Sequence, residues 1–233
     1  MKASDIWAIV GCEESQAITI ELRKLGVNAF SCDLKPCSGG HPEWHLQMDV
    51  FEGLKWAKWN YAMFNPTCTR LTNAGVLRLY YGGKKENGID PVKWQEMLYG
   101  AAFFKALLNY GITYTRVENP IPHGYALKEI GEKYKQIIQP YNFNEDASKA
   151  TCLWAHNLPI IKNTGYFPPR IVDGKKRWSN QTDSGQNKLP PDSKENPGRR
   201  AELRSKTYPG IAQAIAQQDI KHILSNQIST LLF

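Results

Sequence analysis

Short apolar runs alternate with helical patterns along the first half of this 233-residue chain, and this alternation most constrains its fold. Residues 6–10 and 61–64 are continuous apolar runs, typical of strands buried on both faces, and residues 27–32 form a further expected strand. Ser15 is a candidate N-cap for a helix that continues to about Leu25 with apolar side chains at helical spacing and stops at Gly26. Strands that alternate with helices form parallel sheets covered on both faces. We therefore predict an α/β fold with a doubly wound, mostly parallel sheet.

The pattern continues beyond residue 88. Asp90 and Pro91 are a typical N-cap and first residue of a helix. The other expected elements are a strand over 112–117, a helix over 123–135, strands over 134–139 and 149–154, and a final helix opened by Tyr208-Pro209-Gly210. No internal repeat is visible, so we expect a single domain over residues 1–233.

Residues 170–206 differ from the rest of the chain. They are polar, poorly periodic and rich in Pro, Gly, Ser and Asn. They hold ten Lys or Arg against five Asp or Glu, which gives +5 of the chain's net charge of +7. We predict a flexible basic segment that either becomes ordered when it binds an anion or stays a solvated loop.

Two of the expected strands end in residues with reactive side chains. Asn65-Pro66-Thr67-Cys68 follows the run at 61–64, and Glu118-Asn119 follows the strand at 112–117. Because open α/β sheets bind ligands at the carboxyl ends of their strands, we expect Cys68 and Glu118 to share one crevice. The alternative for Cys68 is a small buried hydrophobic residue, which is the commoner role of a free cysteine.

The first strand–turn–helix unit has features of a nucleotide site. Gly11 ends the first strand, and Asp33 ends the second, where a carboxylate can accept hydrogen bonds from ribose hydroxyls. Asp49 lies near the next sheet edge, where it could accept from an adenine amino group. The alternatives are a turn cap for Asp33 and a helix cap for Asp49, ahead of residues 51–57.

The amino-acid composition indicates the cellular compartment of the protein and the kinds of molecule that it could bind. The five cysteines are an odd number and are scattered, so we expect reduced thiols in a cytoplasmic protein. No apolar run approaches the roughly 18 residues that span a bilayer, and residues 1–5 lack a signal-peptide pattern. We expect neither a membrane nor an obligate protein partner. The charge of +7 favours nucleic acid, nucleotides or phosphate.

Two further clusters lead to weaker expectations. The loop over residues 70–88 is basic and aromatic, and it either closes over a substrate or is an ordinary insertion. Trp178, Tyr80 or Tyr81 could stack on bases. Cys32, Cys37, His41 and His45 have metal-ligand chemistry but lack the paired spacing of structural zinc sites, so we expect no metal.

Taken in order, these motifs resemble those of the cytosine-C5 DNA methyltransferases that use S-adenosylmethionine. The chain is most similar to short phage-type members that lack a large target-recognition domain, over residues 6–120 and 199–217. The matching segments are Gly11 (cofactor turn), Asp33 (ribose), Asp49 (adenine), Asn65-Pro66-Thr67-Cys68 (nucleophile loop), Glu118-Asn119, and residues 204–210 before the last helix. The chain departs from the family in lacking the aromatic residue and second glycine around Gly11, and in having Thr67 and Pro120 at motif positions.

The resemblance implies a Rossmann-like methyltransferase fold and transfer of a methyl or related group to C5 of cytosine in DNA. Cys68 would form a covalent adduct at C6, Glu118 would protonate N3, and Asn119 would orient the amine. The implied cofactor-binding residues are Gly11, Asp33, Asp49, Asn65 and Pro66, and the implied substrate-binding residues are Arg70, Arg78, Arg199, Arg200 and Arg204.

Two other functions remain open from the sequence. One is the same chemistry on a free pyrimidine nucleotide, and the other is a non-catalytic nucleic-acid-binding protein that retains the fold. The DNA could be duplex or single-stranded. The expected location is the cytoplasm, which is that of the host if the chain is phage-encoded.

Overall fold

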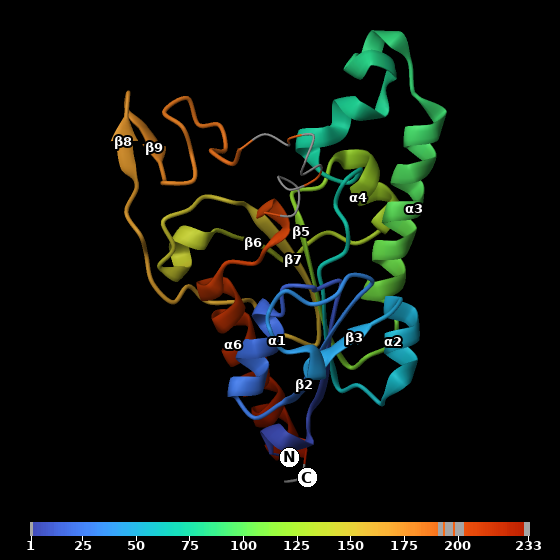
Figure 1. Cartoon of the computed structure of the whole chain (residues 1–233), viewed down its shortest axis with the longest axis vertical. Coiled ribbons are helices and arrows are strands. Elements are labelled where there is room, and N and C mark those ends of the chain that lie inside the picture. Colours follow the sequence, from blue (N-terminus) through green and yellow to red (C-terminus); the bar gives the residue numbers. More distant parts are fainter. Residues whose placement is uncertain (1, 191–192, 194–197, 199–202, 231–233) are drawn as a thin grey trace.

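A computed structural model describes residues 2–190, 193, 198 and 203–230, and its centre is a seven-stranded sheet in the order β3-β2-β1-β4-β5-β7-β6 (Figure 1). The strands are β1 (Trp7–Gly11), β2 (Asn28–Asp33), β3 (His45–Gln47), β4 (Tyr61–Phe64), β5 (Tyr114–Pro120), β6 (Gln136–Ile138) and β7 (Thr151–His156). Strands β1 to β5 pair in parallel, whereas β7 runs antiparallel to both β5 and β6. The strand order reverses between β1 and β4, which is where such sheets bind ligands. The predicted Rossmann-like α/β fold is confirmed.

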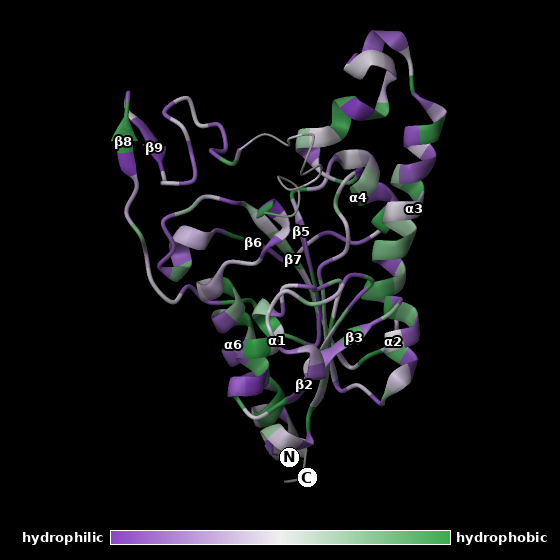
Figure 2. Cartoon of the chain, in the orientation of Figure 1, coloured by the Kyte–Doolittle hydropathy of each residue, from purple (hydrophilic) through white to green (hydrophobic). Residues whose placement is uncertain are grey.

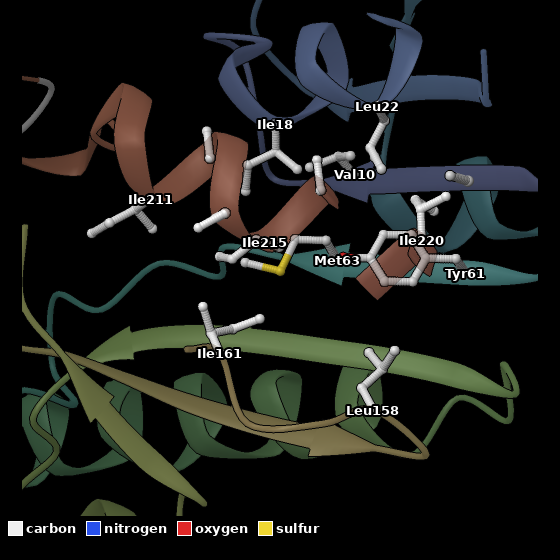
Figure 3. Packing of buried hydrophobic residues seen from close by; sticks show 14 of the residues in the cluster. Val10, Ile18, Leu22, Tyr61, Met63, Leu158, Ile161, Ile211, Ile215 and Ile220 are labelled. Carbon is white, nitrogen blue, oxygen red and sulfur yellow. The ribbon is translucent and has the colours of Figure 1, made fainter. Parts of the chain in front are cut away.

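Helices cover both faces of the sheet. One face carries α1 (Ala17–Lys24) and α6 (Pro209–Thr230), and the other carries α2 (Val50–Trp56), α3 (Pro91–Leu108) and α4 (Gly124–Ile130). Strand β4 is buried on both sides: Tyr61 and Met63 join the α1–α6 core, shown in Figure 3, and Ala62 and Phe64 join the opposite core. This two-sided burial explains the continuous apolar run in the sequence. No helix in the described part of the chain is long and apolar enough to cross a membrane.

Several element boundaries differ from the predictions: the helix expected over 123–135 spans only Gly124–Ile130, and the strands expected over 134–139 and 149–154 span Gln136–Ile138 and Thr151–His156. Two further differences can be traced to specific contacts. Strand β5 continues through Glu118 and Asn119 to Pro120, because β7 pairs with it along that length. Helix α1 begins at Ala17, not directly after Ser15, and the residue before it, Gln16, is left-handed at φ 59°. Ser15 therefore does not cap this helix. Asp90 does cap α3, as predicted, by accepting from the backbone N–H groups of Val92 and Lys93.

The insertion before α3 is folded into short 3-10 helices. They are η3 (Asn73–Leu79), η4 (Tyr81–Gly83) and η5 (Lys85–Asn87), and three more occur elsewhere as η1 (Ala3–Asp5), η2 (Pro42–Trp44) and η6 (Pro140–Phe143). A bridge between Tyr80 and Ile89 closes the insertion, and Asp90 N donates to Leu79 O at 2.9 Å. The segment that we call the insertion, residues 70–90, therefore has a defined shape.

Residues 170–177 form an antiparallel hairpin of β8 (Arg170–Val172) and β9 (Lys175–Arg177). Trp178, directly after β9, stacks on Tyr141 with ring centroids 4.2 Å apart, and its Nε1 donates to Phe167 O at 3.1 Å. Asn180 is tied to Ser148 by two hydrogen bonds. The described part of the basic segment is thus anchored to the main body. Figure 1 places the hairpin and the insertion on opposite sides of the carboxyl ends of the strands.

Candidate functional site

The two predicted reactive motifs lie at adjacent strand ends. Phe64 of β4 pairs with Val117 of β5, so the residues that follow them, Asn65 and Glu118, lie at the same level of the sheet. The side-chain Nδ2 of Asn119 donates to Pro66 O at 3.5 Å, which joins the two motifs directly. The structure thus brings the Cys68 loop and the Glu118-Asn119 strand end to one edge.

A buried histidine fixes the loop after Cys68. His123, only 2% exposed, accepts at Nδ1 from Ala126 N at 3.0 Å, so Nε2 carries the proton and donates to Arg70 O at 2.8 Å. Its backbone N also donates to Leu71 O at 2.9 Å. The chain after Cys68 is thereby held against the chain that follows β5. The sequence showed only a polar residue at the start of α4, so this role was missed.

Cys68 and Glu118 share their electrostatic surroundings. Burial, and next the charge of Glu118, raise the pKa of the half-buried Cys68 thiol, whereas Lys149 and Arg204 oppose the rise. Burial also raises the pKa of Glu118, and Lys149 again opposes it. Lys149 lies just before β7, and its Nζ donates to Lys206 O at 3.3 Å. It acts on both predicted catalytic groups, and sequence reasoning did not identify it.

Two amide oxygens at this edge lack partners. The Oδ1 atoms of Asn65 and Asn119 are buried and accept no hydrogen bond from any residue that the structure describes. The backbone of Asn65 is fixed, since its N donates to Gly11 O at 3.0 Å. These oxygens are therefore positioned acceptors at the carboxyl ends of β4 and β5.

Gly11 has a packing reason for being a glycine. A Cβ atom there would lie 2.6 Å from Phe64 Cδ1 and 2.7 Å from Val50 Cγ2. The left-handed residue of the turn is instead Cys12, at φ 59°. Burial raises the pKa of Cys12 to about 12, with further contributions from Asp33, Cys32 and Asp49. The two predicted cofactor carboxylates therefore both lie near Cys12.

Each of these carboxylates has a local structural role. Asp33 Oδ1 accepts from Lys35 N at 2.9 Å in a turn, and Asp49 Oδ1 accepts from Phe51 N at 2.8 Å as the cap of α2. The Oδ2 atoms accept no hydrogen bond in the part of the chain that the structure describes. The capping role and the cofactor-binding role raised by the sequence are therefore compatible for Asp33 and Asp49. One oxygen of each carboxylate caps the backbone, and the other can still accept from a ligand.

The N-terminus of α1 is occupied by a buried acid. Glu13, 3% exposed, accepts from Ile18 N at 2.7 Å and from the Thr19 hydroxyl at 2.7 Å and N–H at 3.3 Å. Burial raises its pKa to about 7. Helix N-termini commonly bind phosphate through these backbone N–H groups. Here the Glu13 carboxylate already accepts from these N–H groups, so they are not free to bind the phosphate of a ligand.

The predicted substrate arginines have different surroundings. Arg70 pairs with Glu96 of α3 at 2.6 Å, Arg78 is exposed on η3, and Arg204 is exposed and close enough to Cys68 to affect its pKa. Arg199 and Arg200 lie outside the described residues. Of the aromatic side chains expected to stack on bases, Tyr80 and Trp178 are buried, each with only 7% of the side chain exposed, and Tyr81 is 50% exposed.

The histidines near Cys32 have partners within the protein. His45 lies 2.8 Å from Ser31 Oγ through Nδ1 and 2.8 Å from Lys35 O through Nε2, while His41 stacks on Trp44. Among the described residues, no group of three or more His, Cys, Asp or Glu side chains could hold a metal ion.

Comparison with known proteins adds little to this geometry. No protein-family model and no curated protein matches the sequence. Among solved structures, the chain is similar to a candidate DNA modification methyltransferase encoded within an E. coli prophage, with a TM-score of 0.38 and 9% identity. The match covers 64% of this chain and 46% of that one, so the chain matches less than half of that protein's length. We therefore base the function on the site itself.

Proposed function

We propose that this chain transfers a methyl group from S-adenosylmethionine to C5 of cytosine in DNA, with Cys68 as the nucleophile. One observation carries the proposal: Cys68 and Glu118 lie at the ends of adjacent parallel strands, next to the switch point of the sheet, with Lys149 acting on both. A thiol beside an acid of raised pKa is the pair that this reaction requires.

The chemistry follows from the weak nucleophilicity of cytosine C5. Attack of the Cys68 thiolate on C6 forms an S–C6 bond and breaks the C5–C6 π bond, whose electrons shift through C4 to N3, where Glu118 donates a proton. C5 then has enamine character and can take an electrophilic methyl group. The methyl donor would leave as S-adenosylhomocysteine. Return of the N3 proton to the Glu118 carboxylate, loss of the C5 proton to a base and cleavage of the S–C6 bond then restore the aromatic ring and the free thiolate.

Glu118 has to be protonated at neutral pH to act in this way. Its burial raises its pKa in the required direction. Lys149 has a complementary role, because a cation favours the thiolate form of Cys68. The raised pKa of Glu118 favours the protonated acid, whereas burial raises the pKa of Cys68 overall, so formation of the thiolate depends on the opposing charges of Lys149 and Arg204.

The residues near Cys12 fit S-adenosylmethionine, which supplies an electrophilic methyl group on a sulfonium and contains no phosphate. Asp33 and Asp49 each keep a carboxylate oxygen for ribose hydroxyls or the adenine amine. Their negative charge favours a cationic ligand. Glu13 at the start of α1 argues against a phosphate-bearing dinucleotide.

Cofactor binding can be measured by calorimetry. We expect S-adenosylmethionine and S-adenosylhomocysteine to bind, and Asp33→Ala to weaken binding by roughly 10- to 100-fold, since a charge-assisted hydrogen bond contributes roughly 1.5–3 kcal/mol. Glu52→Ala, an exposed acid on α2, serves as the control and should bind normally. Absence of binding by the unaltered protein would contradict the assigned cofactor.

Covalent trapping tests the nucleophile. With S-adenosylmethionine and DNA that contains 5-fluorocytosine, the wild-type chain should form a denaturation-resistant adduct, because the fluorine cannot leave as a proton does. Cys68→Ala should form none, whereas the control Cys37→Ala, at a half-exposed loop thiol, should match wild type. Equal behaviour of wild type and Cys68→Ala would exclude Cys68 as the nucleophile, and absence of an adduct in both would favour the non-catalytic DNA-binding alternative.

A further inference from the structure

The side chain of Asn65 has a polar atom that the rest of the protein does not satisfy. Its Oδ1 is buried and accepts no hydrogen bond from any residue that the structure describes. Native proteins rarely leave a buried acceptor unpaired without a functional reason. The face of the sheet on which Asn65 lies determines which donor can reach this oxygen.

Side-chain alternation along β4 places Asn65 on the face that carries α1 and α6. Met63 belongs to the core on that face, and Phe64 belongs to the opposite core. Asn65 continues the strand, because its backbone N donates to Gly11 O of β1 at 3.0 Å. Successive side chains of a strand point to opposite faces, so the Asn65 side chain lies on the α1–α6 face.

Glu118 lies on the same face, directly beside Asn65. Its partner in β7 is Leu153, which belongs to the core under α1 and α6. Phe64 of β4 pairs with Val117 of β5, so Asn65 and Glu118 are the next two neighbours along these parallel strands. Adjacent strands lie about 4.8 Å apart, which brings the two side chains within reach of each other.

A carboxyl group beside an amide oxygen is stable when it keeps its proton and donates it. An ionised carboxylate would place two acceptors against each other. We propose that Oδ1 of Asn65 accepts the carboxylic acid hydrogen of Glu118, which makes Asn65 a positioning residue for the proton that the reaction delivers to N3. This inference rests on the proposed function, and it reassigns Asn65 from the cofactor to the catalytic acid.

The charged and titratable groups around Glu118 agree with this role. Burial raises the pKa of Glu118, and Lys149 opposes the rise. Cys68 and Cys152 are thiols whose pKa values the Glu118 charge raises in turn. Arg116, two positions earlier on the same face, is already neutralised in a buried ion pair. When the proton moves from Glu118 to N3, Lys149 stabilises the carboxylate that remains.

The test titrates Glu118 directly in the full chain. Infrared difference spectra between each protein and its Glu118→Gln counterpart isolate the C=O band of the protonated acid, and loss of this band with rising pH reports the pKa of Glu118. Asn65→Leu keeps the size of the side chain but removes the acceptor. Glu118 should then bind its proton roughly 3- to 10-fold more weakly and lose it at lower pH. Asn73→Leu, at an exposed position of the insertion, is the matched control and should titrate as wild type does.

Asn65→Asp gives a second measurement, which also decides the question if Asn65→Leu fails to fold. It keeps an acceptor of the same shape and adds a negative charge. Glu118 should therefore hold its proton to higher pH than it does in wild type. The two substitutions at residue 65 are thus expected to shift the titration in opposite directions.

Two results would overturn the inference. A higher pKa of Glu118 in Asn65→Leu would show that the amide N–H group, and not the oxygen, faces the acid. An unchanged titration in both variants would show that Asn65 does not contact Glu118, and S-adenosylmethionine binding weakened at least about tenfold would then return Asn65 to the cofactor. Absence of a 5-fluorocytosine adduct in wild type would contradict the proposed function instead, and the titration would still decide whether Asn65 and Glu118 are bonded.

Discussion

At the scale of single residues, burial raises the pKa of both Cys68 and Glu118, and Lys149 opposes the rise in each. The rate requires a deprotonated Cys68 and a protonated Glu118, which gives a bell-shaped dependence on pH. Lys149 lowers the pKa of both groups, so its removal raises both values. We expect Lys149→Met to move both limbs of the profile for adduct formation to higher pH.

The matched control for this experiment is Lys128→Met. Lys128 is exposed on α4 and is not among the main charges that shift the pKa of Cys68 or Glu118, so its removal should leave both limbs in place. A profile of Lys149→Met that coincides with that of wild type, or one in which a single limb moves, would show that Lys149 does not act on both groups.

The pairing of Cys68 with Glu118 could be predicted because each follows an apolar run and the ends of parallel strands share an edge. The contributions of Lys149 and His123 could not. A lysine before a strand and a histidine before a helix have no distinctive local pattern. Their roles arise from contacts with Lys206 and Arg70, which only the folded chain brings close.

At the scale of elements, α6 is fastened to the sheet by a buried carboxylate. Asp219, fully buried, accepts from Arg116 of β5 at 2.7 and 2.5 Å and from the Tyr61 hydroxyl of β4 at 3.0 Å. Asp219→Ala would leave the buried guanidinium unpaired. We expect it to lower the free energy of unfolding by about 3–5 kcal/mol, measured by chemical denaturation.

Two comparisons separate the unpaired charge from other effects of this substitution. Lys221→Ala, at an exposed position of the same helix, should change stability by less than about 0.5 kcal/mol. The double variant Arg116→Met with Asp219→Leu removes both charges and should recover most of the loss. A double variant as unstable as Asp219→Ala would show that packing, and not the unpaired charge, explains the effect.

The limits of sequence-based prediction at this scale come from long-range pairing. The strand at 112–117 was correctly located, but its extension to Pro120 depends on β7, which comes later in the chain. The start of α1 depends on Glu13, which bonds to N–H groups of the first turn in place of Ser15. The β8–β9 hairpin is anchored by the stacking of Trp178 on Tyr141, which composition could not indicate.

At the scale of the whole molecule, two projections flank the carboxyl ends of the strands (Figure 1). The insertion exposes Arg78, Lys84 and Lys85, and the hairpin exposes Lys175 and Lys176. Figure 2 shows β9 as one of the strongly hydrophilic parts of the chain. A mononucleotide has a single phosphate and needs one or two cations. Cations on both projections suit a longer polyanion, which favours DNA over a free nucleotide.

Salt dependence tests this choice of substrate. Each phosphate contact contributes a slope of about −0.9 to a plot of log affinity against log salt for duplex DNA. We expect a steep slope for the wild-type chain, and a slope reduced by about 2 for Lys175→Ala combined with Lys176→Ala. The control pair Lys55→Ala with Lys58→Ala, at the opposite end of the sheet, should keep the wild-type slope.

The substrate itself can be identified by incubating the chain and labelled S-adenosylmethionine with duplex DNA, single-stranded DNA and deoxycytidine monophosphate. Flipping a base out of a duplex costs a few kcal/mol, so single-stranded DNA should accept label at least as fast as duplex unless the two projections offset that cost. We expect label in DNA. Label found only in the mononucleotide, with a shallow salt slope, would assign a nucleotide substrate to the same Cys68 chemistry.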